Sequence, residues 1–329
     1  MNIVKAVSFK VASTLMFAIM SVQARYLGST FPVGELAFFR GVFGLLPVLV
    51  FFGMRGELRG ALQTNRISAH LMRGIFTVTG TFCTFGALAR LPIADVTAIL
   101  FLAPLITVIF AWLILKEQVH GYRWTAVAIG FGGVILMLSP YMGNHAALTT
   151  SMVIGLGLAV LNAVSSGGAT IQIRRLTATE KSSSIVIFMT LIIIAVSLAT
   201  IPFGWVMPTT PLDVALLVGI GISGGLGQMF FTDSYRYAPA SFLAPFDYTS
   251  MLWAFLLGFW VFGEVPTVYV VIGAFIVAAA GIYVILRERA LGLKRLRELE
   301  LTSVSTESEA QGDPDAAVVT SVVAVRATP

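Results

Sequence analysis

The chain has 329 residues, of which 57% are hydrophobic and only 11% are charged, and its formal net charge at pH 7 is +5. A water-soluble globular protein carries about 25% charged residues, so this composition excludes that class. We interpret the chain as an all-α membrane protein, because a helix that crosses the hydrocarbon core needs about 20 mostly apolar residues and such segments recur along it.

Ten apolar segments follow one another along the chain. The first follows Lys5 and Lys10 and resembles a signal peptide, but it has no convincing small-residue cleavage site, so we retain it as a transmembrane helix. A window of about 19 residues predicts ten transmembrane helices at residues 8–26, 33–53, 71–89, 94–115, 123–140, 151–172, 184–205, 213–233, 241–263 and 267–286.

Lysine and arginine gather on one predicted side of the membrane. The N-terminal lysines share that side with groups of Lys and Arg in the connections 55–66, 116–123, 174–181 and 287–297. The opposite side holds only Arg25 and Arg90. Because short cytoplasmic loops carry the excess of Lys and Arg, we expect both termini in the cytoplasm. The positive charge is then a topology signal, and we expect no nucleic-acid partner.

The two halves of the chain share a layout. Residues 87–117 align without a gap to residues 234–264, so that Glu117 meets Glu264. In both halves a span rich in aromatic residues ends at this glutamate, and a span dense in Gly and Ala follows. Five spans per half is an odd number, so the halves must cross in opposite senses as inverted five-helix repeats, an arrangement typical of secondary transporters.

This repeat predicts the domain organisation. The first five-helix repeat covers residues 8–140, and the second covers 151–286. After Arg297 the sequence is rich in Ser, Thr, Ala, Val and acids without periodicity, so we expect 287–329 to be a disordered cytoplasmic tail.

Two motifs carry a family resemblance. APLITVIFAWLILKE (103–117) and APFDYTSMLWAFLLGFWVFGEVP (244–266) resemble the paired EamA domains of the drug/metabolite transporter superfamily. The resemblance covers roughly residues 8–287 and implies a ten-helix bundle in a bacterial inner membrane that moves a small metabolite by alternating access. The run at 227–248 is similar to transporters of riboflavin and of S-adenosylmethionine within that superfamily.

Three charged residues within or near the apolar segments are candidates for function, because a charge at the bilayer centre costs at least about 2.5–3.5 kcal/mol. Arg40 either contacts substrate or orients its helix. Asp247 either binds substrate or a proton, or stabilises a helix N-terminus, with Arg236 assisting. Asp95, near Arg90, stands at the matching outer position, which suggests either a gate-like pair at each mouth or symmetric helix caps.

Polar and aromatic residues complete the candidate set. Amides and acids on the sixth and eighth spans either bond between helices or line a pocket: Asn162, Gln172, Gln228 and Asp233. Aromatic residues recur on four spans, including Phe246, Tyr248 and Trp253. A cavity walled by such rings, with amides between them, suits a planar heteroaromatic solute, so riboflavin uptake is our first expectation and S-adenosylmethionine or amino-acid transport the alternative.

Other functions are less consistent with the sequence. An intramembrane enzyme needs a nucleophile, a metal cluster or a carboxylate pair, and we find no HExxH, no GxSxG and no convincing acid pair. A channel is disfavoured because ion filters usually need oligomeric rings. We expect no cofactor and no metal, and the direction of transport, the coupling ion and the oligomeric state, a homodimer included, stay open.

Overall fold

The computed structural model describes residues 3–56, 58, 63–64, 66–116, 121–142, 149–176, 180–238, 243–284, 286–287 and 290. Every regular element in these residues is a helix, which confirms the predicted all-α class. The residues up to Ile282 form one compact unit, and a second unit begins at Tyr283. The predicted tail at 287–329 lies almost entirely outside the described residues.

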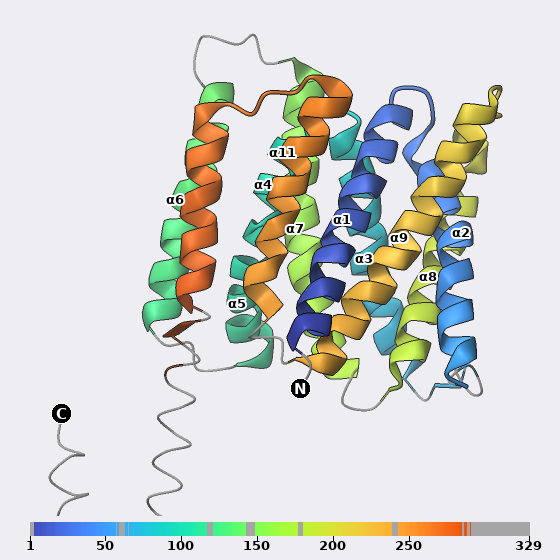
Figure 1. Cartoon of the computed structure of the whole chain (residues 1–329), viewed down its shortest axis with the longest axis horizontal. Helices are drawn as coiled ribbons and strands as arrows, with labels where there is room; N and C mark the ends of the chain where they lie inside the picture. The colour runs from blue at the N-terminus through green and yellow to red at the C-terminus, as the bar shows by residue number, and fades with distance from the viewer. Residues whose placement is uncertain are drawn as a thin grey trace, which may run out of the picture. The chain divides into compact units, whose positions relative to one another are not determined.

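The helices run side by side between the two ends of the bundle (Figure 1). The first half comprises α1 (Ile3–Leu27), α2 (Val33–Met54), α3 (Ile67–Leu88), α4 (Ile93–Leu100), α5 (Leu102–Leu115) and α6 (Gly121–Met142). The second half comprises α7 (Thr150–Leu176), α8 (Ser182–Leu198), the short η1 (Ile201–Phe203), α9 (Pro211–Tyr237), η2 (Ala244–Tyr248), α11 (Thr249–Phe262) and the helix Val268–Val284.

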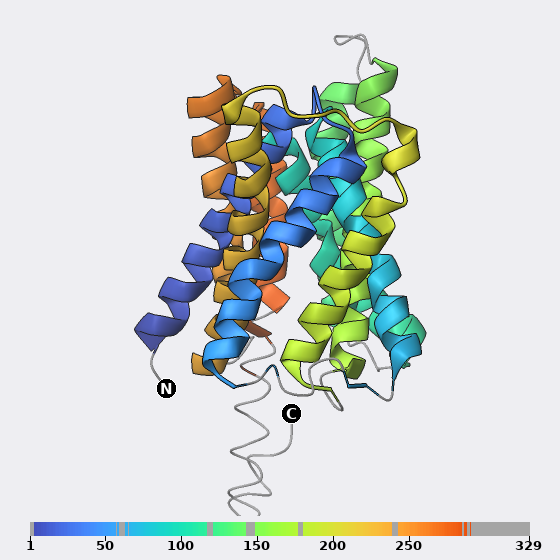
Figure 2. The same cartoon turned by 90° about the vertical axis from the view of Figure 1, so that its right-hand side faces the viewer.

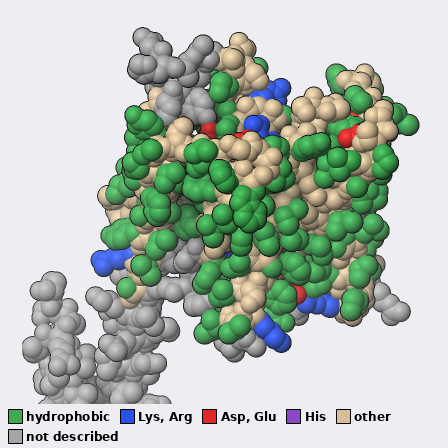
Figure 3. Space-filling model, turned by 45° about the horizontal axis from the view of Figure 1, so that its top comes forward, with side chains coloured by type: hydrophobic (Ala, Val, Ile, Leu, Met, Phe, Trp, Pro, Cys, Tyr) green, Lys and Arg blue, Asp and Glu red, His purple; other side chains and the backbone are tan. Residues whose placement is uncertain are grey.

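These elements account for the ten predicted spans. Among the described residues, 7 helical spans are long and apolar enough to cross a membrane, with α4 and α5 counted as one, and three shorter apolar helices complete the set. Hydrophobic side chains cover much of the face in Figure 3, whereas the charged ones gather toward its ends. Large apolar residues such as Trp260 and Phe275 are exposed on the surface, as lipid contact requires.

Two spans are interrupted where the same four residues occur. The sequence FLAP occupies 101–104 and 242–245. Phe101 separates α4 from α5, and the 3₁₀ turn η2 precedes α11. Proline has no N–H and clashes with the carbonyl four residues earlier, so Pro104 accounts for the break at the end of α4.

The seventh span is shorter than predicted. The expected span 184–205 ends as a helix at Leu198, and η1 and an extended segment follow. Pro202 cannot continue the hydrogen bonding, and Gly204 has a φ of 89°, which is a left-handed conformation that ends the turn. The hydropathy window did not predict these breaks in the helix.

Contacts between the halves come in matched pairs, as expected when two inverted repeats pack together. The contact of α3 with α7 has its counterpart in α1 with α9, and the contact of α2 with α9 has its counterpart in α3 with α8. Figure 1 shows α1 starting at the end of the bundle where the N-terminus lies, and α7 starting at the opposite end. Figure 2 shows from the side that these two helices start at opposite ends of the bundle.

The ends of α5 and α11 correspond in detail. Lys116 has a φ of 53° and Gly263 a φ of 66°, so each helix stops at a left-handed residue. These positions are 147 apart, as in the alignment that pairs Glu117 with Glu264. Glu117 itself lies outside the described residues.

Candidate functional site

A cavity of about 190 Å³ lies between α1, α2, α3 and α7, midway along α3 and α7. Its wall therefore combines helices of the first half with one helix of the second half. Its lining residues are Met20, Arg40, Phe76, Thr77, Gly80, Thr81, Thr84, Phe85, Asn162, Ser166 and Ala169.

An amide network crosses the cavity wall from α7 to α3. Asn162 Nδ2 donates to Thr84 Oγ1 at 2.6 Å, and Asn162 Oδ1 accepts from Ser166 Oγ at 3.3 Å. The hydroxyl of Thr84 donates in turn to the carbonyl of Gly80 at 2.8 Å. These bonds join the two helices without a ligand and leave one N–H of the Asn162 amide for a further partner.

Arg40 is different, because its guanidinium has no hydrogen bond or ion pair with any described residue. Its stem packs on α9, where a Cβ added at Gly224 would lie 3.6 Å from Arg40 Cγ and 3.0 Å from Met20 Sδ. An added Cβ would therefore make an ordinary contact with Arg40 and a tight one with Met20.

Ion pairs connect helices at the end of the bundle where the N-terminus lies. Lys10 Nζ contacts Asp247 Oδ1 at 2.6 Å, with the lysine side chain fully buried and the aspartate 43% exposed. Thr14 and Thr249 share a 2.8 Å hydrogen bond one turn further into the same helix interface. The side chain of Arg236, the expected partner of Asp247, lies outside the described set, and Lys10 is the partner that the described residues show.

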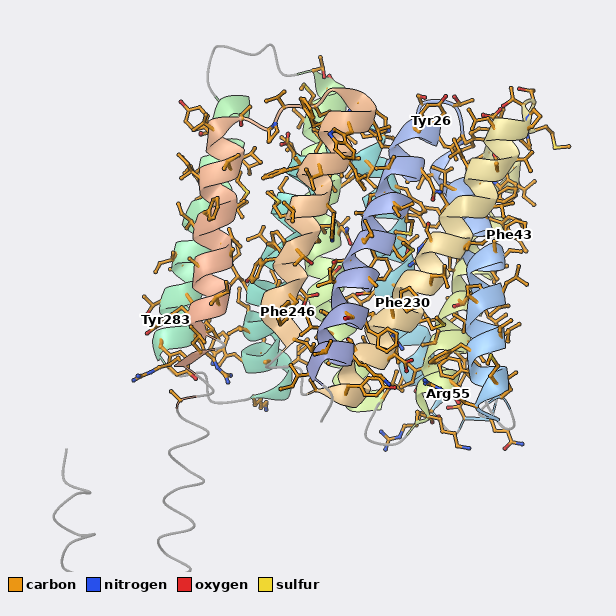
Figure 4. The ribbon with its side chains drawn as sticks, in the orientation of Figure 1. Tyr26, Phe43, Arg55, Phe230, Phe246 and Tyr283 are labelled. Carbon is orange, nitrogen blue, oxygen red and sulfur yellow. The ribbon has the colours of Figure 1, made fainter. Side chains whose placement is uncertain are left out.

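A second ion pair at this end joins α9 to the end of α2. Arg55 Nη2 lies 2.8 Å from Asp233 Oδ1, and the guanidinium lies 3.7 Å from the ring centroid of Phe51. Figure 4 shows Arg55 at this end of the bundle and Tyr26 at the other.

At the opposite end of the bundle, Arg25 and Glu264 form an ion pair. Arg25 Nε donates to Glu264 Oε1 at 2.6 Å, and Glu264 Oε2 accepts from the backbone N–H of Ile93 at 2.9 Å. Arg90 donates to the carbonyl of Gly86 at 2.8 Å and forms no ion pair with Asp95, which is buried in the first turn of α4. The ion pair that the described residues show at this mouth joins Arg25 to Glu264.

Of the ten predicted site residues, Arg40 and Asn162 line the cavity. Trp253 donates to Thr14 Oγ1 at 3.3 Å, and Tyr248 packs against Phe101 with ring centroids 4.9 Å apart. Gln172 is buried on α7, and Gln228 lies in a small pocket beside Phe51. Asp95, Asp233 and Asp247 take the positions described above, and Phe246 lies on η2 near the end of the bundle where the N-terminus is (Figure 4).

Sequence reasoning missed the α3 side of the cavity. Thr77, Thr81 and Thr84 follow the i, i+4, i+7 spacing that places residues on one helix face, and this was the available signal. It also missed Lys10, Arg25 and Glu264 as partners, although their charges were visible. Among the described residues, no group of three or more His, Cys, Asp or Glu could hold a metal ion.

Comparison with family profiles identifies one family. The profile of the EamA-like transporter family matches residues 4–139 and again residues 153–287. A crystal structure of a protein that is 20% identical matches with a TM-score of 0.62, over 87% of this chain and 98% of its own chain, which concerns the fold alone.

Curated relatives cover most of the chain but differ in what they carry. The S-adenosylmethionine uptake transporter of Rickettsia prowazekii is 28% identical, covering 83% of this chain and 89% of its own. The pseudopaline exporter CntI of Pseudomonas aeruginosa is 26% identical, and the match covers 82% of this chain and 92% of the exporter. The riboflavin transporter of Vibrio cholerae is 29% identical, and the match covers 80% of this chain and 87% of that transporter.

Proposed function

The chain belongs to the EamA-like transporter family, and from this premise we propose that it moves a small heteroaromatic metabolite across a bacterial inner membrane by alternating access through the cavity between α1, α2, α3 and α7. The family places it among multi-pass membrane transporters and not among enzymes. We further propose that both termini are cytoplasmic.

The cavity wall is the observation that carries this proposal. Phe76 and Phe85 present aromatic side chains beside the hydroxyl groups of Thr81 and Ser166. A planar ring stacks on aromatic side chains while its heteroatoms bond to hydroxyl and amide groups. A lining shared by both halves is also where inverted-repeat transporters hold their substrates.

Two substrates fit this description. Riboflavin has a planar heteroaromatic ring, as the aromatic content of the sequence first suggested, and a relative is a riboflavin transporter. S-adenosylmethionine combines an adenine ring with an amino-acid group, and a relative is its uptake transporter. Uptake is therefore the direction we propose.

Transport assays test the proposal directly. A bacterium that expresses the chain should accumulate labelled riboflavin or labelled S-adenosylmethionine faster than the empty-vector strain, with saturable kinetics. The Ala169→Phe variant fills the cavity with a ring and should abolish that uptake, whereas Leu161→Phe, which changes a side chain exposed on the outside of the same helix, should preserve it. Uptake of neither compound would refute both substrate assignments.

A further inference from the structure

We propose that Arg40 binds a carboxylate of the substrate, so that the transported solute is an amino-acid-like carboxylate carrying a ring and not a neutral ring compound. This inference rests on the proposed function and names the substrate class of the same cavity.

The charge of the cavity wall is the first argument. Among the described residues, the eleven that line it include one arginine and no aspartate or glutamate. A lone cation within a membrane protein costs at least about 2.5–3.5 kcal/mol unless a partner or water offsets it. An anionic group on the solute supplies that partner whenever the cavity is occupied.

Four other arginines of the bundle give the second argument, because each of them is engaged by the protein. Arg25 and Arg55 bind carboxylates of Glu264 and Asp233. Arg73 donates to the carbonyl of Ile185 at 3.2 Å, and Arg90 donates to that of Gly86. An arginine that only orients its helix has such contacts, and the guanidinium of Arg40 has none with the described residues.

The available donors fit a carboxylate. The hydroxyls of Thr84, Ser166 and Thr77 all donate within the protein, and Asn162 uses one of its two amide N–H groups on Thr84. Arg40 and Thr81 are the lining residues whose polar side chains form no bond within the described part of the chain. A guanidinium binds a carboxylate through two parallel hydrogen bonds, and a hydroxyl donates a further one.

A matched pair of ligands tests the inference on the wild-type protein alone. S-adenosylmethionine and its decarboxylated analogue differ only by the carboxylate, and riboflavin serves as the neutral ring compound. Binding is measured by calorimetry on protein in lipid nanodiscs. We expect the carboxylate form to bind at least about tenfold more tightly than its analogue, as a charge-assisted bidentate contact allows.

Variants assign that preference to residues. Arg40→Gln should bring the ratio of the two dissociation constants close to one, whereas Arg40→Lys should keep part of it because the charge remains. Thr81→Val, which removes a hydroxyl at nearly constant shape, should lower the ratio a few-fold. Arg90→Gln removes the same charge outside the cavity and should leave the ratio as in the wild type.

The outcomes separate the two claims. Equal affinity of the wild type for both members of the pair, or a preference that survives Arg40→Gln, overturns the carboxylate assignment and leaves the transporter proposal in place. Riboflavin binding as tightly as S-adenosylmethionine also counts against the assignment. Binding of none of the three compounds removes the proposed substrates, and the inference falls with them.

Discussion

Asn162 connects two helices from different halves through a single amide. Replacing it with alanine removes the bonds to Thr84 and Ser166. Hydrogen bonds between membrane helices contribute about 0.6 kcal/mol on average, so we expect Asn162→Ala to lower the unfolding temperature by a few degrees. The neighbouring Leu161 is 46% exposed on the surface, and Leu161→Ala should not change that temperature. Equal melting of the two variants in detergent would argue against a structural role for the amide.

Gly263 provides a second prediction at the residue scale, because its φ of 66° is unfavourable for any residue with a Cβ. Gly263→Ala should destabilise the protein by roughly 1 kcal/mol. Gly132 lies within α6, where an added Cβ meets nothing within 4 Å, so Gly132→Ala should be neutral or slightly stabilising. A urea or heat denaturation series that ranks the two variants in the opposite order would contradict this account.

Single residues were predictable to the extent that their chemistry stands out from an apolar background. Arg40 stood out because a charge in an apolar helix is costly, and it does face the cavity. Thr81 and Thr84 did not stand out, since threonine is an ordinary residue of membrane helices. The bond between Arg25 and Glu264 joins residues 239 apart, and no spacing in one sequence identifies such a partner.

At the scale of elements, α1 is joined to the ninth span at both ends. Lys10 pairs with Asp247 at one end of α1, and Arg25 pairs with Glu264 near the other. The Thr14–Thr249 bond lies between these pairs. We therefore expect α1 to be fixed to η2 and α11 in this conformation of the protein.

The Lys10–Asp247 pair can be tested by comparing a single with a double variant. Asp247→Asn leaves a fully buried lysine without its carboxylate and should destabilise the protein by about 1–3 kcal/mol, less than a fully buried pair because Asp247 is 43% exposed. Lys10→Met combined with Asp247→Asn removes the buried charge and should recover much of the loss. Thermal melting measures the stability of both variants. A double variant as unstable as the single one would show that the buried charge of Lys10 does not cause the loss of stability.

Element boundaries followed hydropathy except where the backbone is interrupted. The pattern predicted α2 and α9 within a few residues, since their apolar runs end at polar loops. It did not predict the break at Phe101 or the early end of α8 at Leu198, because hydropathy is insensitive to the missing N–H of Pro104 and Pro202.

The whole molecule was the most predictable level. Ten apolar segments, an odd number per half and a shared glutamate position were enough to predict two inverted five-helix repeats, and the fold confirms this architecture. The same features say little about the solute, because they describe the scaffold that differently named relatives share.

The membrane orientation yields a prediction at this scale. Cys83 is the single cysteine and is buried, so Cys83→Ala provides a background without thiols. On that background, Met207→Cys should react in intact cells with a thiol reagent that cannot cross membranes, because Met207 is exposed at the predicted outer end. Gln63→Cys, exposed at the other end, should react only after the cells are opened. The reverse pattern would place the termini outside.

We propose that the cavity beside Arg40 is the water-accessible path of the solute. The most direct measurement places a cysteine there, as Thr81→Cys with Cys83→Ala, and follows its reaction with the same reagent in intact cells and in inverted membrane vesicles. We predict reaction from at least one side, slowed by S-adenosylmethionine, and no reaction of Leu161→Cys on the outward surface of α7. A Thr81→Cys thiol that stays unreactive from both sides, in a protein whose Met207→Cys form reacts, would contradict the account.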